Sequence, residues 1–495
     1  MAILDGSVVN VALPIIGTGL AASITVMQWV VNAYVMVTAA LNLIGGSAGD
    51  RFGRRRIFAI GIIIFATGSI WCGLAADALD LVVARILRGI GGALMVPNSL
   101  ALIGATFEAE ERGKAIGTWA GATAIAGALG PVLGGWLTDA VSWRAVFFVN
   151  LPFAVVALGI TWRHIPESRE AGAAANLDWR GAVLATSGLS AVTFALIQSS
   201  DLGWRHPAVF GSLIAGALLL ALFVRAEATS AEPMMPLTLF SSRIFSGINL
   251  LTLLLYGALA GAFFFIPFDL IRVQGYSAAL AGAAFLPFPL ILAALSRWSG
   301  GLLDRFGARL PLIIGPLIVA FGFALFAWPG VGGTYWLDFF PPMVILGLGM
   351  AVSVAPLTTT VMNAVPARNT GAASGINNAV ADVAALLAVA LFGVMGLAVF
   401  ARALDGHLIG ASLPPDLGRI VDTIKDSLAG TSLPTAVLDA DRKVLKAAID
   451  ASFLVSFRLL MVGAAILALF GALCAALTMG DGGREPQTHK VGSTR

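Results

Sequence analysis

The chain has 495 residues, of which 58% are apolar and 12% are charged, and its formal net charge is +3. A mean hydropathy of +0.91 excludes an ordinary soluble domain. The small net charge does not indicate a nucleic-acid partner. The two cysteines, Cys72 and Cys474, fall in apolar runs and the four histidines are scattered. We therefore expect no disulfide framework, no metal site and no other cofactor.

Apolar runs of about 20 residues, each long enough to cross a bilayer as a helix, recur along the whole chain. The runs are continuously apolar rather than alternating, which favours transmembrane helices over a β-barrel. The sequence therefore predicts an all-α polytopic membrane protein with fourteen spans. They lie near residues 1–20, 27–48, 57–76, 79–104, 114–137, 144–162, 180–199, 207–224, 244–267, 277–297, 310–328, 336–360, 370–400 and 453–478.

The distribution of lysine and arginine predicts how these spans cross the membrane. With the amino terminus inside, the inner connections and the tail carry eighteen basic residues and the outer connections carry nine. Because cytoplasmic loops are enriched in basic residues, we expect a cell-membrane protein with both termini in the cytoplasm. Residues 401–452 form the one sizeable outer loop, and 437–449 resembles an amphipathic surface helix. Whether this loop is a lid or a spacer is open.

The first span carries an acidic residue, Asp5, only four residues from the start of the chain. No basic leader precedes it, so we expect a late start site or a trimmed end rather than a signal peptide. An ionised group at membrane depth indicates a functional site, because its insertion costs about 3 kcal/mol. The alternative is a terminal residue at the membrane interface.

The connection between the second and third spans combines glycines, a carboxylate and guanidinium groups. It reads Gly46-Ser47-Ala48-Gly49-Asp50-Arg51-Phe52-Gly53-Arg54-Arg55-Arg56. Anchoring to anionic lipid headgroups explains the arginines but not Asp50. A carboxylate here can pair with Arg54 or face a helix amino terminus. We therefore predict a gating latch, with lipid anchoring as the alternative. Its residues are Gly46, Asp50, Arg51, Gly53 and Arg54.

A similar hinge returns in the second half as Gly300-Gly301-Leu302-Leu303-Asp304-Arg305-Phe306-Gly307-Ala308-Arg309. Asp304, Arg305 and Gly307 are its counterparts of the first latch. A repeated hinge predicts two similar helical bundles within one chain, as in many secondary transporters.

Two further charged residues stand inside predicted spans. Arg85, in the fourth, shares a helix face with glycines, and Asp382, in the thirteenth, shares a face with Asn378. Burial favours the protonated form of a carboxyl group, so Asp5 and Asp382 are candidates for proton exchange. Snorkelling to the nearer surface is the alternative for Arg85, and a helix–helix polar contact for Asp382.

Neutral polar residues form a stripe on the second span that includes Gln28 and Asn32. Together with Asn378 they are predicted to line a substrate cavity. Interhelical hydrogen bonds are an equal alternative.

The fifth span contains the sequence Gly127-Ala128-Leu129-Gly130-Pro131-Val132-Leu133-Gly134-Gly135. Pro131 removes a backbone hydrogen bond and bends the helix, while the glycines leave room for the bend. Small residues also let neighbouring helices approach closely. This cluster predicts a pivot formed by Gly127, Gly130, Pro131, Gly134 and Gly135.

These motifs together resemble those of a known family. Four segments match, in order, motifs of the major facilitator superfamily: Leu4 to Pro14, the Asp50 hinge, Arg85 to Gly89, and Gly127 to Gly135. Two others resemble signatures of its fourteen-span drug:proton antiporters, the EmrB/QacA-type subfamily: Trp143 to Pro152 and Leu177 to Gly181. The similarity covers essentially the whole chain.

The resemblance implies the major facilitator fold, with two six-helix bundles around a central cavity and two extra transmembrane helices between them. The expected divisions are 1–165 for the N-terminal bundle, 166–240 for the inserted helices and their linkers, 241–480 for the C-terminal bundle with its outer loop, and 481–495 for a cytoplasmic tail.

The resemblance further implies export driven by inward proton movement, with Asp5 and Arg85 as coupling or substrate residues, Asp50 and Arg54 as the latch, and the glycine–proline cluster as an antiporter motif. Two positions depart from the family pattern. Arg88 stands where glutamine is frequent, and Ala308 replaces a basic residue of the second hinge.

The expected function is therefore a proton-coupled antiporter for hydrophobic or cationic small molecules, working by alternating access as a monomer. No Gly-Lys-Ser/Thr phosphate loop occurs, which disfavours direct ATP-driven pumping. One alternative is a narrow exporter of a single endogenous metabolite or antibiotic. A membrane-embedded enzyme or receptor is a weaker alternative, because no nucleophile or metal constellation is evident.

Overall fold

The computed structural model of the chain describes residues 1–107, 109–169, 178–230, 233, 235–366, 370–409, 421, 424–425 and 439–479. Within these ranges the regular structure is helical throughout and contains no strand. The helices are α1 (Ala2–Gly19), α2 (Ile24–Phe52), α3 (Arg54–Leu74), α4 (Ala78–Thr106), α5 (Ala109–Ala140), α6 (Ala145–Phe148), α7 (Asn150–His164), α8 (Trp179–Leu202), α9 (Pro207–Thr229), η1 (Leu237–Ser241), α10 (Arg243–Phe268), η2 (Asp269–Val273), α11 (Ala278–Ala284), α12 (Pro287–Gly300), α13 (Leu302–Phe306), α14 (Arg309–Phe326), η3 (Tyr335–Phe339), α15 (Phe340–Asn363), α16 (Thr370–Leu408) and α18 (Asp439–Thr478).

Every predicted span coincides with helix, and twelve helical segments of the described chain are long and apolar enough to cross a membrane. The protein is therefore an all-α polytopic membrane protein. Helices α4 and α5 are not among these twelve, and α4 carries the charged residues Asp80, Arg85 and Arg88. The count of fourteen spans stays a prediction.

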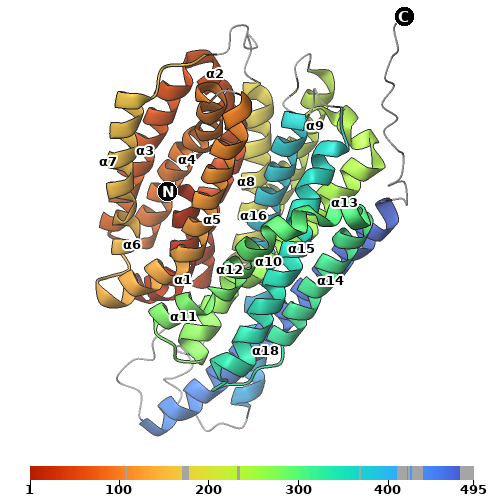
Figure 1. Cartoon of the computed structure of the whole chain (residues 1–495). Helices are drawn as coiled ribbons and strands as arrows, with labels where there is room; N and C mark the ends of the chain where they lie inside the picture. Colours follow the sequence, from red (N-terminus) through yellow and green to blue (C-terminus); the bar gives the residue numbers. More distant parts are fainter. Residues whose placement is uncertain are drawn as a thin grey trace, which may run out of the picture.

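The order of helix packing separates the two ends of the chain. In the first set, α2 and α3 pack against α4, α1 against α5, and α3 against α7. In the second set, α10 packs against α16 and α18, α14 against α15 and α18, and α12 against α15. Figure 1 shows the first set, coloured red to orange, on the left and the second, green to blue, on the right. The predicted division into two bundles at 1–165 and 241–480 stays a prediction.

Three groups of contacts join the two sets. Helix α11 packs against α5, α1 packs against α10, and α16 packs against α2. The inserted helices α8 and α9 pair with each other, and α8 also packs against both α2 and α16. Helix α8 thus lies at a junction between the two sets, whereas α9 buries only 11% of its apolar window.

Two predicted spans contain breaks. The sixth is divided into α6 and α7 at Val149, and the tenth into α11 and α12.

The predicted surface helix at 437–449 is not a separate element in its described part, because α18 runs without interruption from Asp439 to Thr478. Its buried residues Leu445 and Ile449 join the same core as the membrane-depth residues.

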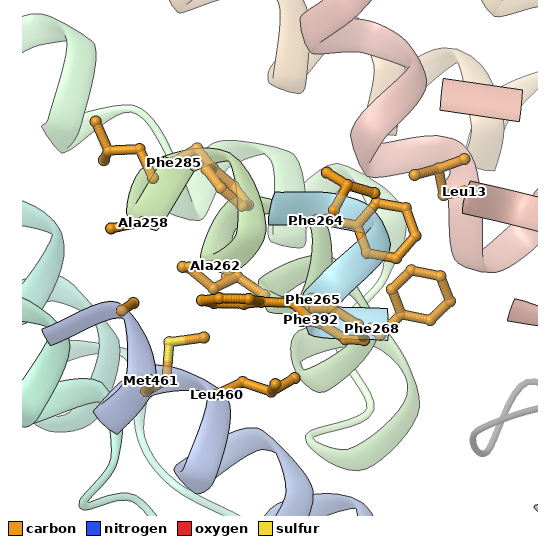
Figure 2. Packing of buried hydrophobic residues seen from close by; sticks show 14 of the residues in the cluster. Leu13, Ala258, Ala262, Phe264, Phe265, Phe268, Phe285, Phe392, Leu460 and Met461 are labelled. Carbon is orange, nitrogen blue, oxygen red and sulfur yellow. The ribbon is translucent and has the colours of Figure 1, made fainter. Parts of the chain in front are cut away.

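The core consists of aromatic and aliphatic side chains packed between both sets of helices. Figure 2 shows Phe264, Phe265 and Phe268 of α10 close to Leu13 of α1 and Phe392 of α16. Gly261 of α10 leaves space for the Phe392 ring, because a methyl group at this position would lie 2.6 Å from that ring. This packing fixes α10 between α1 and α16.

The two ends of the molecule are distinguished by their turns. The hinge end is the one where α2 turns into α3, and the far end is the opposite one, where α5 ends and α11 begins. The chain starts at mid-height of the first set rather than at either end (Figure 1).

Candidate functional site

A buried ion cluster links α1 and α4. Asp5 is held between two guanidinium groups, with Arg85 Nη1 2.6 Å from its Oδ2 and Arg88 Nη2 2.7 Å from its Oδ1. All three residues are at most 1% exposed. The interfacial position considered for Asp5 and the snorkelling considered for Arg85 are therefore both wrong in this structure. An uncompensated charge would be costly at this depth, which explains the pairing.

The two arginines reach different neighbours. Arg85 Nε donates a hydrogen bond to the Val30 carbonyl of α2 at 2.8 Å, and its guanidinium lies 4.5 Å from the centre of the Tyr34 ring. Arg88 instead lies over Phe65 of α3 at 4.5 Å. With one carboxylate and two guanidiniums, the cluster has more positive than negative groups. Its position joins α1 to α2, α3 and α4.

Sequence reasoning did not include Arg88 among the site residues. Residues three and four apart lie on neighbouring parts of a helix surface, so Arg85 and Arg88 could both have been placed toward one acidic partner. This three-residue spacing was the feature of the sequence that indicated Arg88. The sequence did not indicate that Asp5 is the acidic partner, since Asp5 lies 80 positions away from Arg85.

The first hinge contains the predicted ion pair. Arg54 Nε lies 2.8 Å from Asp50 Oδ1 across the turn between α2 and α3. Gly53 forms this turn with φ of +112°, a conformation that favours glycine. Gly46 lies within α2, and Arg51 is exposed and stacks on the ring of Phe52. The role of this pair as a gating latch stays a prediction.

A second carboxylate at this hinge was not predicted. Glu167, from the segment after α7, accepts a hydrogen bond from the Arg55 backbone nitrogen at 3.0 Å, at the first turn of α3. The Arg54 nitrogen also donates to the Ser168 carbonyl at 3.0 Å. The carboxylate that faces the helix amino terminus is therefore Glu167, and it connects α3 to the end of α7.

The second hinge, like the first, turns at a glycine with positive φ. Gly307 has φ of +69° between α13 and α14, and Gly53 has φ of +112° between α2 and α3. Arg305 is exposed, and the side chain of Asp304 lies outside the described set. The repeated turn follows from the glycine at the same place in both motifs.

The predicted pivot of α5 lies between α1 and α11. A methyl group at Gly130 or Gly134 would collide with Ser7 or Val8 of α1. One at Gly135 would overlap the Ala278 carbonyl of α11, whereas at Gly127 the nearest atom is 3.6 Å away in Ile3. The glycines therefore allow α5 to approach two helices at the level of the backbone.

The same contact holds α11 in place from its other side. A methyl group at Gly282 of α11 would overlap the Pro131 carbonyl, so both helices contribute a glycine. At the far end, Asp139 of α5 accepts hydrogen bonds from the Ala278 and Ala279 nitrogens at 3.2 and 2.7 Å. We call this contact between α5 and α11 the far-end seam. Asp139 is a residue that the sequence analysis missed.

A second contact across the same end involves Arg272 of η2, which donates a hydrogen bond to the Pro14 carbonyl of α1. Nearby Asp269 is 1% exposed and lies 3.5 Å from the Gln274 amide nitrogen. Arg272 therefore connects the second set of helices to the first.

The contacts of the polar residues on α2 agree only in part with the predicted substrate cavity. The Gln28 amide nitrogen donates to the Val389 carbonyl of α16 at 2.6 Å, which is the interhelical alternative. Asn32 is fully buried, and its amide oxygen and nitrogen have no hydrogen-bond partner in the described structure. Asn378 is exposed, whereas its neighbour Asn377 donates to Thr252 of α10 at 2.7 Å.

Asp382 lies on α16, one helical turn before Leu386. Leu386 forms a buried cluster with Met36 and Val37 of α2, and Leu189 of α8 packs against this cluster. Because residues four apart share a helix face, Asp382 is on the side of α16 that faces α2 and α8. No hydrogen bond or ion pair joins it to a described residue. It is therefore not part of the Asp5 cluster, and the structure does not bring these two acidic residues together.

Comparisons with known proteins place these features in a family. A family model described as Major Facilitator Superfamily matches residues 1–389. The tetracenomycin C resistance and export protein of Streptomyces glaucescens is 32% identical over 97% of this chain and 89% of its own length. A puromycin resistance protein of Streptomyces alboniger is 36% identical, covering 82% of this chain and 81% of the relative. The multidrug resistance protein Stp of Mycobacterium tuberculosis is 34% identical over 82% of this chain and 76% of its own.

Solved structures agree on the fold. A bacterial homolog of the human lysosomal transporter Spinster, in an inward-facing and occupied conformation, has a TM-score of 0.65 at 18% identity, over 96% of this chain and 93% of that chain. A POT family transporter, PepTSo, has a TM-score of 0.61 at 16% identity, over 96% of this chain and 95% of that chain. At such identities the likeness shows the fold alone.

Proposed function

Because the chain belongs to the major facilitator superfamily, and is thus a membrane transporter of small molecules rather than an enzyme, we propose that it is a proton-coupled exporter of hydrophobic or cationic compounds. The buried cluster of Asp5 with Arg85 and Arg88 is the observation that supports this most directly. Ionisable groups at membrane depth mark sites of transport or proton exchange. Relatives named for antibiotic resistance, export and multidrug resistance support the direction of transport and the class of substrate.

The proposed mechanism is alternating access. The first set of helices (1–165) and the second (241–480) change their mutual orientation, while α8 and α9 stay attached at the junction. Asp382, without a cationic partner in the described structure, takes up a proton as substrate leaves. Asp5 and Arg85 tie α1, α2 and α4 together around the site.

The hinges and the far-end seam control this motion in the proposal. The Asp50–Arg54 pair and Gly53 hold the turn between α2 and α3, and Arg305 with Gly307 marks its counterpart. The glycines of α5 permit the close contact with α11 when the far end is shut. Opening that end requires the contacts of Asp139 and Arg272 to separate.

We place the protein in the cell membrane with its hinge end in the cytoplasm and both ends of the chain directed toward that side, so that the far end faces outside. The excess of basic residues on the predicted inner connections supports this orientation. We expect a monomer, because both sets of helices belong to one chain.

The test uses purified protein in proteoliposomes with an imposed pH gradient, scanned across a panel of dyes and antibiotics. Substrate movement should require the gradient and should stop when an ionophore collapses it. Asp5→Asn and Asp382→Asn should each abolish gradient-driven transport. Transport that is unchanged in the double variant, or that ignores the gradient, would remove the assignment of proton coupling.

A narrower function is the second candidate. Two relatives of this chain are named for one antibiotic each, tetracenomycin C and puromycin, whereas a third is named for multidrug resistance. The same panel separates the two possibilities, since a narrow exporter would move one compound or one close chemical series.

A further inference from the structure

The inserted helix α8 faces α2 along a line of polar side chains that have no role in the proposed transport mechanism. Three contacts fix the register of these antiparallel helices. Thr25 donates to Asp201 at 3.1 Å, the Trp29 and Phe194 rings lie 6.3 Å apart, and Ser190 donates to the Met36 sulfur at 3.0 Å. Both helices advance by the same number of residues between the first and last of these contacts, so the pairing is continuous.

This register brings two buried polar side chains to the same level. Asn32 lies one turn from Met36 on α2, and Thr193 lies one turn from Ser190 on α8, both toward the far end. Each is 0% exposed. Neither the Asn32 amide nor the Thr193 hydroxyl has a hydrogen-bond partner in the described structure. Buried polar groups without partners are uncommon, and ordered water often satisfies them.

The line of polar groups continues in both directions. Toward the far end, Gln28 donates to α16 and Thr25 reaches the exposed carboxylate of Asp201. Toward the hinge end, Ser190 of α8 lies at the level of Met36, and Asp382 of α16 lies one helical turn beyond the level where Leu386 meets Met36. Successive groups along α2 are one helical turn apart, about 5.4 Å. One water molecule spans that distance with two hydrogen bonds of about 2.8 Å each.

We propose that α2, α8 and α16 enclose a proton-access path from the outer surface at Asp201 to Asp382, with buried water bridging Asn32 and Thr193. The inference rests on the proposed proton coupling at Asp382. It gives the inserted helix a function, which is to supply one wall of the path. In the transfer, a hydronium O–H bond breaks at the outer surface, O–H bonds exchange along the bridging water, and a carboxylate oxygen of Asp382 gains the proton.

The charged groups along the junction fit such a path. Helix α2 has no charged residue before Asp50, and α8 has none between Arg180 and Asp201. Asp201 and Asp382 therefore bound the path at its two ends. No cation from these stretches of α2 and α8 stands between them to repel an incoming proton.

The decisive variant is Thr193→Val, which keeps the shape of the side chain and removes only the hydroxyl. If Thr193 is merely structural, removing a buried hydroxyl that lacks a partner should leave the thermal unfolding temperature equal or higher, and proton movement unchanged. If Thr193 belongs to the path, stability should be retained while the rate of proton uptake falls on the order of tenfold, which corresponds to about 1.4 kcal/mol. The matched control is Thr67→Val, since Thr67 bonds the Ile63 carbonyl on α3, a helix that does not line the path.

Proton uptake is measured on the purified chain with a pH-indicator dye in weakly buffered solution after a rapid pH change, alongside proton movement in proteoliposomes. Asp382→Asn should remove the component of proton uptake that depends on this carboxyl group, and Asn32→Leu should slow that component as Thr193→Val does. Normal uptake in Thr193→Val and Asn32→Leu would overturn the path even if wild-type coupling is confirmed. Absence of any Asp382-dependent signal in the wild type would instead count against the proposed function.

Discussion

At the scale of single residues, the main feature is the unequal charge of the Asp5 cluster. One carboxylate serves two arginines, and all three are sealed from solvent. Breaking a buried ion pair by removing one partner costs more than the pair itself contributes, because the other charge is left without compensation. The three members should therefore respond very differently to neutral substitution.

Asp5→Asn should be the most damaging of these changes, since it leaves Arg85 and Arg88 facing each other. We expect a loss of about 3–5 kcal/mol in stability and no measurable transport. Arg88→Gln leaves a one-to-one pair of Asp5 with Arg85 and should fold nearly as stably as the wild type. Thermal unfolding temperatures measured in detergent test this predicted order of stability. Equal melting temperatures for the two variants would contradict the charge argument.

At the scale of elements, the start of α3 depends on a partner from elsewhere in the chain. Glu167 accepts the Arg55 backbone N–H and approaches Arg56 at 3.6 Å. Gly53 both adopts the positive φ and leaves space for this carboxylate, because a methyl group at that position would lie 2.7 Å from it. The hinge is thus a three-segment contact among α2, α3 and the end of α7.

Gly53→Ala tests this hinge. The left-handed backbone conformation costs an L-residue about 1–2 kcal/mol, and the overlap with Glu167 adds to it. Gly159→Ala in α7 is the matched control, since open space surrounds that position and the alanine should stabilise the helix slightly. Melting temperatures and protease sensitivity near the hinge measure the difference. A Gly53→Ala protein as stable as Gly159→Ala would exclude the proposed role of the turn.

The glycines of α5 make a second prediction at this scale. Gly135→Ala should push α5 away from the Ala278 carbonyl and open the far-end seam, while Gly127→Ala should have little effect because its nearest neighbour is 3.6 Å away. With Cys72 and Cys474 replaced, an Ala278→Cys reporter, at a position that is 1% exposed, should react on the order of tenfold faster with an impermeant maleimide in the Gly135→Ala background. Similar rates in both glycine variants would show that close packing does not keep the seam shut.

At the scale of the whole molecule, the two sets of helices are joined at the far end by backbone-level contacts. Asp139 caps α11, and Arg272 reaches α1, so each set contributes a side chain to the other. These are hydrogen bonds that a rocking motion can break and remake. The far end is accordingly the place where a cross-link should stop transport.

Asp139→Cys combined with Ala279→Cys should form a disulfide on mild oxidation, since Asp139 Oδ2 lies 2.7 Å from the Ala279 nitrogen. Transport should fall to background in the oxidised protein and return on reduction. The single variants, treated in the same way, control for oxidation itself. Full transport by the cross-linked protein would contradict separation of this seam during the cycle.

Much of this molecule could be predicted from the chain alone, because crossing a bilayer is a local property. An apolar run long enough for a transmembrane helix can be recognised without knowing which helix packs against it. In the same way, a glycine in a basic turn indicates a backbone conformation that other residues rarely adopt. The apolar helices and the glycine turns of both hinges follow from such local patterns, whereas the pivot role of the α5 glycines stays a prediction. The Asp50–Arg54 pair was also within reach, since its partners are four residues apart.

The partners of the remaining site residues depended on packing between distant segments, and only the tertiary structure decided them. Asp5 meets two arginines of α4, Glu167 rather than Asp50 faces the start of α3, and Asp139 caps a helix of the other set. A side chain's charge can be read from the sequence, but the group that neutralises it depends on which helices become neighbours. That choice is made by the complementary shapes of glycines and bulky side chains over the whole fold.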